Sequence, residues 1–153
     1  MNAQPIQRGR VLIVDDETDI LEGMKALLEI EGMDVITHDS MITLPLILRD
    51  ADPDVILLDI SLPALSGSAL LNPGRNRLLR TDATVILFSG RSADELEGLA
   101  HKFGADGFVT KSQDPMEIVA RVQTWISQRR AQRAAEGKGV SNVSTRTASP
   151  AAR

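Results

Sequence analysis

The sequence predicts an α/β fold in which a five-stranded parallel sheet carries helices on both faces. Short apolar runs alternate with helical patterns along the chain, and three of the runs are continuously apolar and rich in β-branched residues. A parallel strand that is covered on both faces requires such a run. The resulting order, βαβαβαβαβα, favours right-handed crossovers within a single sheet.

The five predicted strands are these apolar runs. They lie at residues 11–14, 35–36, 55–58, 85–88 and 108–109. After the first run, apolar side chains recur at spacings near three and four over residues 17–31, which predicts a helix that buries one face and ends at Gly32. The second helix is predicted to begin near Thr43, because this start places Pro45 in the first turn.

The later helices have readable ends. The segment Ser92-Ala93-Asp94-Glu95 is a capping box, and Gly104 is suited to end the helix that it opens. Asp114 followed by Pro115 opens the last helix in the same way. In the middle of the chain, Asn72-Pro73-Gly74 interrupts the third helix, so we expect only a short helix over residues 68–71.

Composition limits the class of protein. The chain has 153 residues, of which 42% are hydrophobic and 25% charged, proportions that suit one globular domain. Its apolar runs are far shorter than the roughly 20 residues that span a bilayer. The first ten residues lack the apolar stretch of a secretory signal and the chain has no cysteine, so we expect a cytoplasmic protein without membrane insertion. Only four aromatic residues argue against direct nucleic-acid binding by base stacking.

The formal net charge of -4 combines two unlike segments: residues 1–128 carry -9 and residues 129–153 carry +5. After Gln132 small and polar residues dominate and little can be buried, so we expect a disordered basic tail there. The predicted organisation is one unit over residues 9–128, followed at 129–153 by the end of the last helix and this tail.

Polar side chains follow four of the predicted strands. Asp15 and Asp16 follow the first strand, Asp59 the third, Ser89 the fourth, and Lys111 comes soon after the fifth. In open parallel sheets, ligands bind beyond the carboxyl ends of the strands. Three carboxylates at this edge would repel one another unless a cation neutralises them. A cluster of hard oxygen donors suits Mg²⁺, and Mg²⁺ with a lysine beside a carboxylate suggests phosphoryl transfer, with Asp59 as the nucleophile.

On these residues the sequence resembles the receiver domains of two-component response regulators, over about residues 9–128. The matching segments are 11–17 (VLIVDDE), 53–63 (PDVILLDISLP), 66–67 (SG), 85–90 (VILFSG) and 104–111 (GADGFVTK). The resemblance implies the flavodoxin-like fold of that family. It also implies that Asp59 accepts a phosphoryl group from a histidine kinase or a phosphotransfer protein.

The resemblance implies roles for the remaining site residues as well. Asp16 and Asp59 would bind Mg²⁺ together with the backbone carbonyl of Ser61, and Asp15 would act largely through water. Lys111 would pair with the phosphoryl oxygens and Ser89 would donate a hydrogen bond to one of them. Phe108 would be the aromatic residue that turns inward when Ser89 moves, although an ordinary core phenylalanine explains it equally well.

We therefore expect a single-domain response regulator, not a dedicated enzyme, that signals to a downstream protein target and favours the monomeric state. A magnesium-dependent phosphohydrolase that forms an aspartyl phosphate is an alternative. Such enzymes place an Asp-x-Asp pair and the nucleophile after the first strand, and Asp15-Asp16 does not fit that pattern. A receiver fragment of a longer regulator and a phosphate-independent scaffold are further alternatives.

Overall fold

The computed structural model describes residues 8–61 and 81–147, with side chains as far as residue 137 in the last helix. Five strands form one sheet in the order β2-β1-β3-β4-β5, and every pair is parallel. The strands are β1 (Arg10–Val14), β2 (Asp34–His38), β3 (Val55–Leu58), β4 (Thr84–Ser89) and β5 (Gly107–Thr110). All five predicted strands are confirmed.

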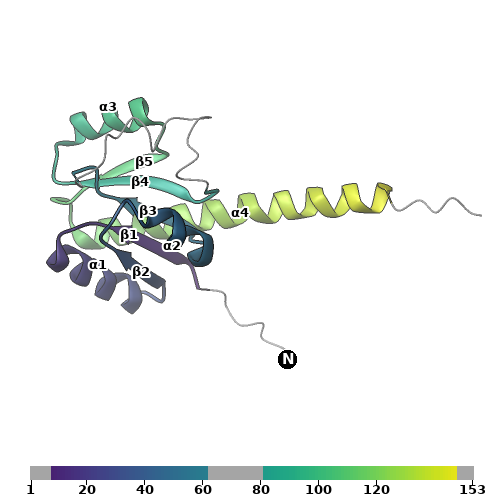
Figure 1. Ribbon diagram of the computed structural model, residues 1–153, viewed down its shortest axis with the longest axis horizontal. Helices are drawn as coiled ribbons and strands as arrows, with labels where there is room; N and C mark the ends of the chain where they lie inside the picture. The colour runs from purple at the N-terminus through teal and green to yellow at the C-terminus, as the bar shows by residue number, and fades with distance from the viewer. Residues whose placement is uncertain (1–7, 62–80, 148–153) are drawn as a thin grey trace, which may run out of the picture.

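Helices cover both faces of the sheet, as predicted (Figure 1). They are α1 (Thr18–Ile30), α2 (Leu44–Ala51), α3 (Ala93–Phe103) and α4 (Pro115–Thr147). Alternate residues of each central strand belong to separate hydrophobic clusters: Leu57 of β3 packs in the cluster that contains α1 and α4, and Ile56 in the cluster that contains α2 and α3. Each fully buried side chain of this size contributes roughly 1.5–3 kcal/mol to the stability of the fold. Because both faces of the central strands are covered, every position along them must be apolar, which explains their continuous apolar runs.

The predicted helix ends agree with the structure. Gly32 follows α1 with a φ of 87°, and Gly104 ends α3 with a φ of 71°, both in the region that favours glycine. At the start of α3, Ser92 Oγ accepts a hydrogen bond from the amide of Glu95 at 3.3 Å. At the start of α4, Asp114 Oδ1 accepts from the amide of Met116 at 2.8 Å. These caps fix where each helix enters and leaves the sheet edge.

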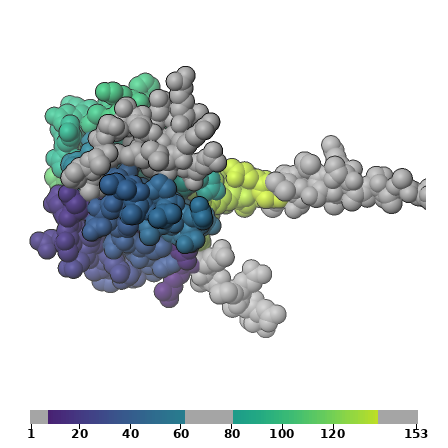
Figure 2. Space-filling model, in the orientation of Figure 1, coloured from purple at the N-terminus to yellow at the C-terminus, as the bar shows by residue number. Residues whose placement is uncertain are grey.

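The prediction of a disordered tail after Gln132 is wrong for residues 133–147, which continue α4 (Figure 1). That prediction considered only the burial of apolar side chains, whereas the first turn of this segment is held by charge. Arg133 instead pairs with Asp54 and Asp82 on the body of the domain. In the space-filling view, the part of α4 that ends at residue 137 emerges from one side of the body (Figure 2). The short helix expected over residues 68–71 and the last six residues lie outside the described part of the chain.

Gly9 lies where the N-terminal segment passes α4. Its carbonyl accepts a hydrogen bond from the amide of Asp34 at 2.8 Å, which fixes its backbone beside β2. A Cβ at this position would lie 2.7 Å and 2.8 Å from two side-chain carbons of Ile126. The close approach of the two segments therefore requires glycine here.

We predict that Gly9→Ala lowers the free energy of unfolding by about 1–3 kcal/mol, because the added methyl group overpacks this contact. Gly98→Ala is the matched control. Gly98 lies within α3 and a Cβ there meets nothing within 4 Å, so this substitution should stabilise by roughly 0.5–1 kcal/mol. Urea denaturation measures both. A Gly9→Ala protein as stable as the wild type would contradict the packing described.

Candidate functional site

The site is built on the carboxyl ends of the strands, and backbone hydrogen bonds fix each position. The amide of Asp15 donates to the carbonyl of His38 at 3.0 Å, and the amide of Asp59 donates to the carbonyl of Val14 at 2.9 Å. On the other side, the amide of Lys111 donates to the carbonyl of Ser89 at 2.8 Å. Residues that are far apart in the sequence are thus held at one sheet edge, as the strand-end argument predicted.

The ammonium group of Lys111 lies among three carboxylates. Its Nζ is 2.7 Å from Asp15 Oδ2, 3.0 Å from Glu17 Oε1 and 3.3 Å from Asp59 Oδ2. The side chains of Asp15 and Asp59 are 0% and 1% exposed and that of Lys111 is 9% exposed, whereas Glu17 is largely in solvent. Because water is nearly excluded, the lysine is the principal charge that offsets the two buried acids.

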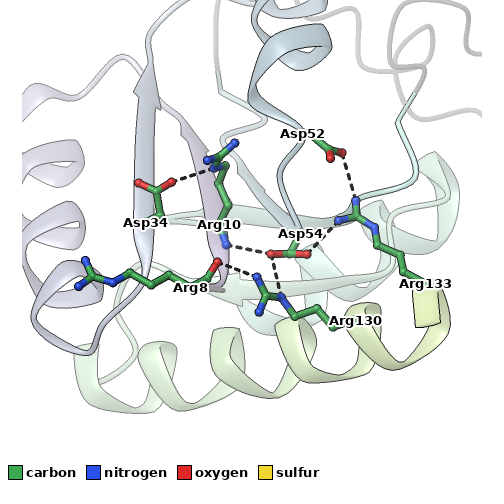
Figure 3. A pocket seen from close by; sticks show the side chains of 7 residues that line it. All are labelled: Arg8, Arg10, Asp34, Asp52, Asp54, Arg130 and Arg133. Carbon is green, nitrogen blue, oxygen red and sulfur yellow. Dashed lines mark hydrogen bonds and ion pairs between the residues drawn. The ribbon is translucent and has the colours of Figure 1, made fainter. Parts of the chain in front are cut away.

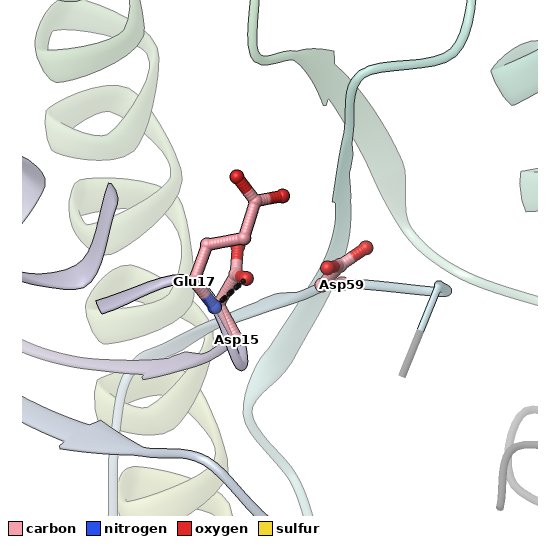
Figure 4. A group of neighbouring side chains, drawn as sticks. All are labelled: Asp15, Glu17 and Asp59. Carbon is pink, nitrogen blue, oxygen red and sulfur yellow. Dashed lines mark hydrogen bonds between the residues drawn. The ribbon is translucent and has the colours of Figure 1, made fainter. Parts of the chain in front are cut away.

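Asp15, Glu17 and Asp59 approach one another closely (Figure 4). One carboxylate oxygen from each lies within 4.8 Å of the others. Asp15 Oδ1 accepts from the amide of Glu17 and Asp59 Oδ1 accepts from the amide of Ser61, both at 2.9 Å. These two bonds fix one oxygen of each buried aspartate and leave the second oxygen directed toward Lys111.

The residues present fit a magnesium ion. All the clustered donors are carboxylate oxygens, which are the ligands that Mg²⁺ prefers. Asp15 Oδ2 is buried and, apart from its ion pair with Lys111, meets no hydrogen-bond donor among the described residues. An acceptor in that position is suited to a metal-bound water.

Burial raises the pKa of Asp15 above its ordinary value of 3.8, and the nearby charge of Asp59 acts in the same direction, against the lowering effect of Lys111. Burial lowers the pKa of Lys111, but its contacts with Asp15, Glu17 and Asp59 outweigh burial, so the pKa lies above 10.5. Stability contributed by Lys111 is therefore present at neutral pH and is lost as the pH rises through this elevated pKa. Asp15 acts differently, because its raised pKa makes the native state lose stability as the pH rises above 3.8.

The structure brings together three of the predicted site residues, Asp15, Asp59 and Lys111. Asp16 lies beside them in the sequence, but its side chain is exposed and is not part of the carboxylate cluster. Ser89 is fully buried at the end of β4, where its Oγ accepts from the amide of Arg91 at 3.4 Å. Phe108 is half-buried and packs against the cluster that contains α2 and α3.

Two residues of the site were missed by sequence reasoning. Glu17 directly follows the aspartate pair. Its acidic side chain at that position was visible in the sequence, but no role was predicted for it. Phe88 precedes Ser89 in β4, and the Lys111 ammonium lies 5.6 Å from the centre of its ring. A cation over an aromatic face is stabilised by the ring quadrupole. The apolar run gave no sign that this phenylalanine contacts the lysine.

We predict that Asp15→Asn stabilises the metal-free protein at neutral pH by about 1 kcal/mol, since it removes a buried charge that repels Asp59. The difference from the wild type should shrink as the pH falls toward 4, because the native wild-type carboxyl, with its raised pKa, takes up a proton and loses the buried charge. Asp16→Asn, which changes the same charge at an exposed side chain, is the control and should have little effect. Thermal unfolding in EDTA between pH 4 and 8 measures this; a destabilised Asp15→Asn would contradict it.

Comparisons with known proteins agree with this geometry. The chain is 34% identical over 115 residues to the phosphate regulon transcriptional regulatory protein PhoB of Pseudomonas aeruginosa, covering 74% of this chain and 49% of that protein. It is 31% identical over 138 residues to the probable transcriptional regulator ycf27 of Pyropia yezoensis, covering 89% of this chain and 54% of that one. The chain thus spans about half the length of these curated relatives.

Among solved structures, the response regulator receiver domain protein (CheY-like) from Methanospirillum hungatei superposes with a TM-score of 0.69 at 26% identity, covering 82% of this chain and 98% of that one. The receiver domain of the Francisella response regulator 1452 gives a TM-score of 0.68 at 26% identity, covering 79% and 98%. The family model for the response regulator receiver domain matches residues 11–123. The chain therefore belongs to the receiver domains of response regulators.

Proposed function

We propose that this receiver domain accepts a phosphoryl group on Asp59, in the presence of Mg²⁺, from a histidine kinase or a phosphotransfer protein. The observation that carries the proposal is the position of Lys111. Its ammonium lies 3.3 Å from Asp59 Oδ2 and 2.7 Å from Asp15 Oδ2 in a site that is almost closed to water. A buried cation at this distance is placed to neutralise charge that develops on a phosphoryl group.

In the proposed reaction, a carboxylate oxygen of Asp59 attacks phosphorus. The new O–P bond forms as the P–N bond to the donor histidine breaks, and the electron pair of that bond stays on the imidazole. The amide of Ser61, 2.9 Å from Asp59 Oδ1, holds the carboxylate in one orientation. Orientation and charge stabilisation are the main contributions that a protein makes to phosphoryl transfer.

We further propose that Asp16, Asp59 and the carbonyl of Ser61 hold the metal, with Asp15 acting through water. Bound Mg²⁺ would supply positive charge to the phosphoryl oxygens. Among the chain's own groups, Lys111 would supply a further positive charge to the phosphoryl oxygens. Glu17, which contacts Lys111 at 3.0 Å, is the partner that the lysine would exchange for phosphate.

A phosphoryl group adds about -1.5 to -2 charges to an edge that is already rich in carboxylates. We propose that the chain responds through Ser89, whose hydroxyl would donate to a phosphoryl oxygen, and through inward rotation of Phe108. Ser89 is buried at the end of β4 and Phe108 is half-buried in the adjacent strand, paired at Leu87. The altered surface around α3 and β5 would then bind a downstream protein.

In this proposal the chain is a signalling module of the cytoplasm, not a dedicated enzyme, and it works through protein contacts without binding nucleic acid directly. Among the described residues, no helix combines the length and the apolar character needed to cross a membrane. A second candidate is the receiver portion of a longer regulator. It is favoured by the observation that the chain spans about half of its curated relatives.

We predict that a small-molecule phosphodonor and Mg²⁺ add one phosphoryl group to the wild type and none to Asp59→Asn, as measured by intact-protein mass spectrometry. Asp39→Asn is the matched control, because Asp39 is an exposed aspartate that follows β2 at the same edge, and it should be labelled like the wild type. Equal labelling of wild type and Asp59→Asn would refute the assignment. Multiple turnovers on a phosphate ester would instead favour a phosphohydrolase.

We also predict that Mg²⁺ stabilises the wild-type fold. A ligand that binds only the native state adds about 2.7 kcal/mol at a concentration of 100 Kd. The gain should be lost in Asp59→Asn and kept in Asp39→Asn, as measured by thermal unfolding with and without Mg²⁺. A gain of the same size in Asp59→Asn would remove Asp59 from the metal site.

A further inference from the structure

Helix α4 carries three arginines within two turns, beyond the end of the family match at residue 123. They are Arg129, Arg130 and Arg133. Figure 3 shows Arg130 and Arg133 directed toward Asp54 at the amino-terminal end of β3, and Arg129 pairs with Asp82 just before β4. Two aspartates pair with these arginines. Asp54 directly precedes β3, and Asp82 lies two residues before β4.

Asp82 is bound by two of these arginines. Arg133 contacts both of its oxygens, with Nη2 2.8 Å from Oδ1 and Nε 3.2 Å from Oδ2. Arg129 Nη2 lies 2.9 Å from Oδ2. A two-point contact between a guanidinium and a carboxylate fixes direction as well as distance. The hydrogen bond from Arg133, aided by Arg129, holds the pKa of Asp82 below its ordinary value of 3.8.

Asp54 is the buried member, with a side chain 5% exposed. Arg133 Nη1 lies 3.0 Å from its Oδ1, and Arg130 Nε lies 3.4 Å from its Oδ2. The backbone amide of Arg10 donates to the same Oδ2 at 2.9 Å. A buried carboxylate requires such partners, so removal of Arg133 takes away the nearer of the two guanidinium groups that compensate its charge.

The N-terminal segment completes the arrangement. Arg130 Nη2 donates to the backbone carbonyl of Arg8 at 2.6 Å, next to the close contact between Gly9 and Ile126. Helix α4 is therefore bound at this edge by the segment before β1 as well as by the residues before β3 and β4.

A pocket of about 550 Å³ lies within this group. Its lining residues are Arg8, Arg10, Asp34, Asp52, Asp54, Arg130 and Arg133. Four basic side chains suggest an anion site, but three aspartates share the pocket and Figure 3 shows arginines directed toward them. An incoming anion would have to displace these carboxylates and would be repelled by them. Because the arginines and aspartates of the pocket neutralise one another, the group is better explained as an internal contact than as a ligand site.

We propose that Arg129, Arg130 and Arg133, with Asp54 and Asp82, form an ionic clasp that docks residues 129–136 of α4 against the amino-terminal edge of the sheet. The clasp makes this part of the helix a component of the domain and sets the direction in which α4 continues to Thr147. It ties the helix to β3, which is followed by Asp59, and to β4, which ends at Ser89. The proposal does not depend on phosphorylation.

Hydrogen exchange of the full chain tests the clasp. In Arg133→Gln, the amides of residues 129–136 should exchange at least tenfold faster, while those of β1 and β3 keep their protection, which shows that the fold persists. Arg49→Gln, at an exposed arginine on α2, is the control of equal charge and should exchange like the wild type. Unchanged exchange at residues 129–136 in Arg133→Gln would overturn the proposal.

The partner assignment is tested by combining Arg133→Gln with Asp82→Asn. If the two side chains act through one contact, the double variant should accelerate exchange by much less than the product of the single effects. If the acceleration in the double variant equals the product of the two single accelerations, the pairing of Arg133 with Asp82 is overturned.

Salt and phosphate distinguish a clasp from an anion site. Raising NaCl from roughly 0.05 M to 0.5 M shortens the screening length about threefold and should speed exchange at residues 129–136 in the wild type more than in Arg133→Gln. Inorganic phosphate at matched ionic strength should change the exchange rate of residues 129–136 as much as chloride does. Slower exchange with phosphate than with chloride would show an anion site and would overturn the assignment as a clasp.

Discussion

The contact on which the site depends is the buried ammonium of Lys111 between Asp15 and Asp59. Like charges held this close in a nearly dry site raise the free energy of the fold unless a cation lies between them. The lysine is supplied by the residue after β5, while the acids follow β1 and β3, so the parallel sheet that aligns their ends is a requirement of the chemistry. The same cation neutralises the acids at rest and is placed to neutralise a phosphoryl group.

The charge of the chain is organised at both edges of that sheet. The carboxylates at the carboxyl edge surround one lysine, whereas at the amino edge the arginines of α4 are matched with Asp54 and Asp82. The positive charge of residues 129–153 is thus partly an internal counter-charge for the acidic body. Because β3 and β4 run from one edge to the other, two short strands join the proposed phosphorylation site to the base of the projecting helix.

Local patterns in the sequence predicted most of the fold. Continuous apolar runs and caps such as Ser92 depend on neighbours within a few residues, so they could be interpreted without coordinates. Asp15, Asp59 and Lys111 were found because strand topology brings strand ends together. Contacts of long side chains could not be found this way: the approach of Lys111 to Glu17 and Phe88, and the pairing of Arg133 with Asp82, depend on rotamers and on distances across the fold. The continuation of α4 was missed for the same reason.

The most direct test of the central claim is the titration of the Lys111 side chain, followed by NMR on selectively labelled protein. The account predicts a pKa above 10.5 in the wild type and a lower value in Asp15→Asn, because the variant lacks the nearest of the three carboxylates. A Lys111 pKa at or below 10.5 in the wild type, unchanged by the substitution, would contradict a lysine held between buried acids.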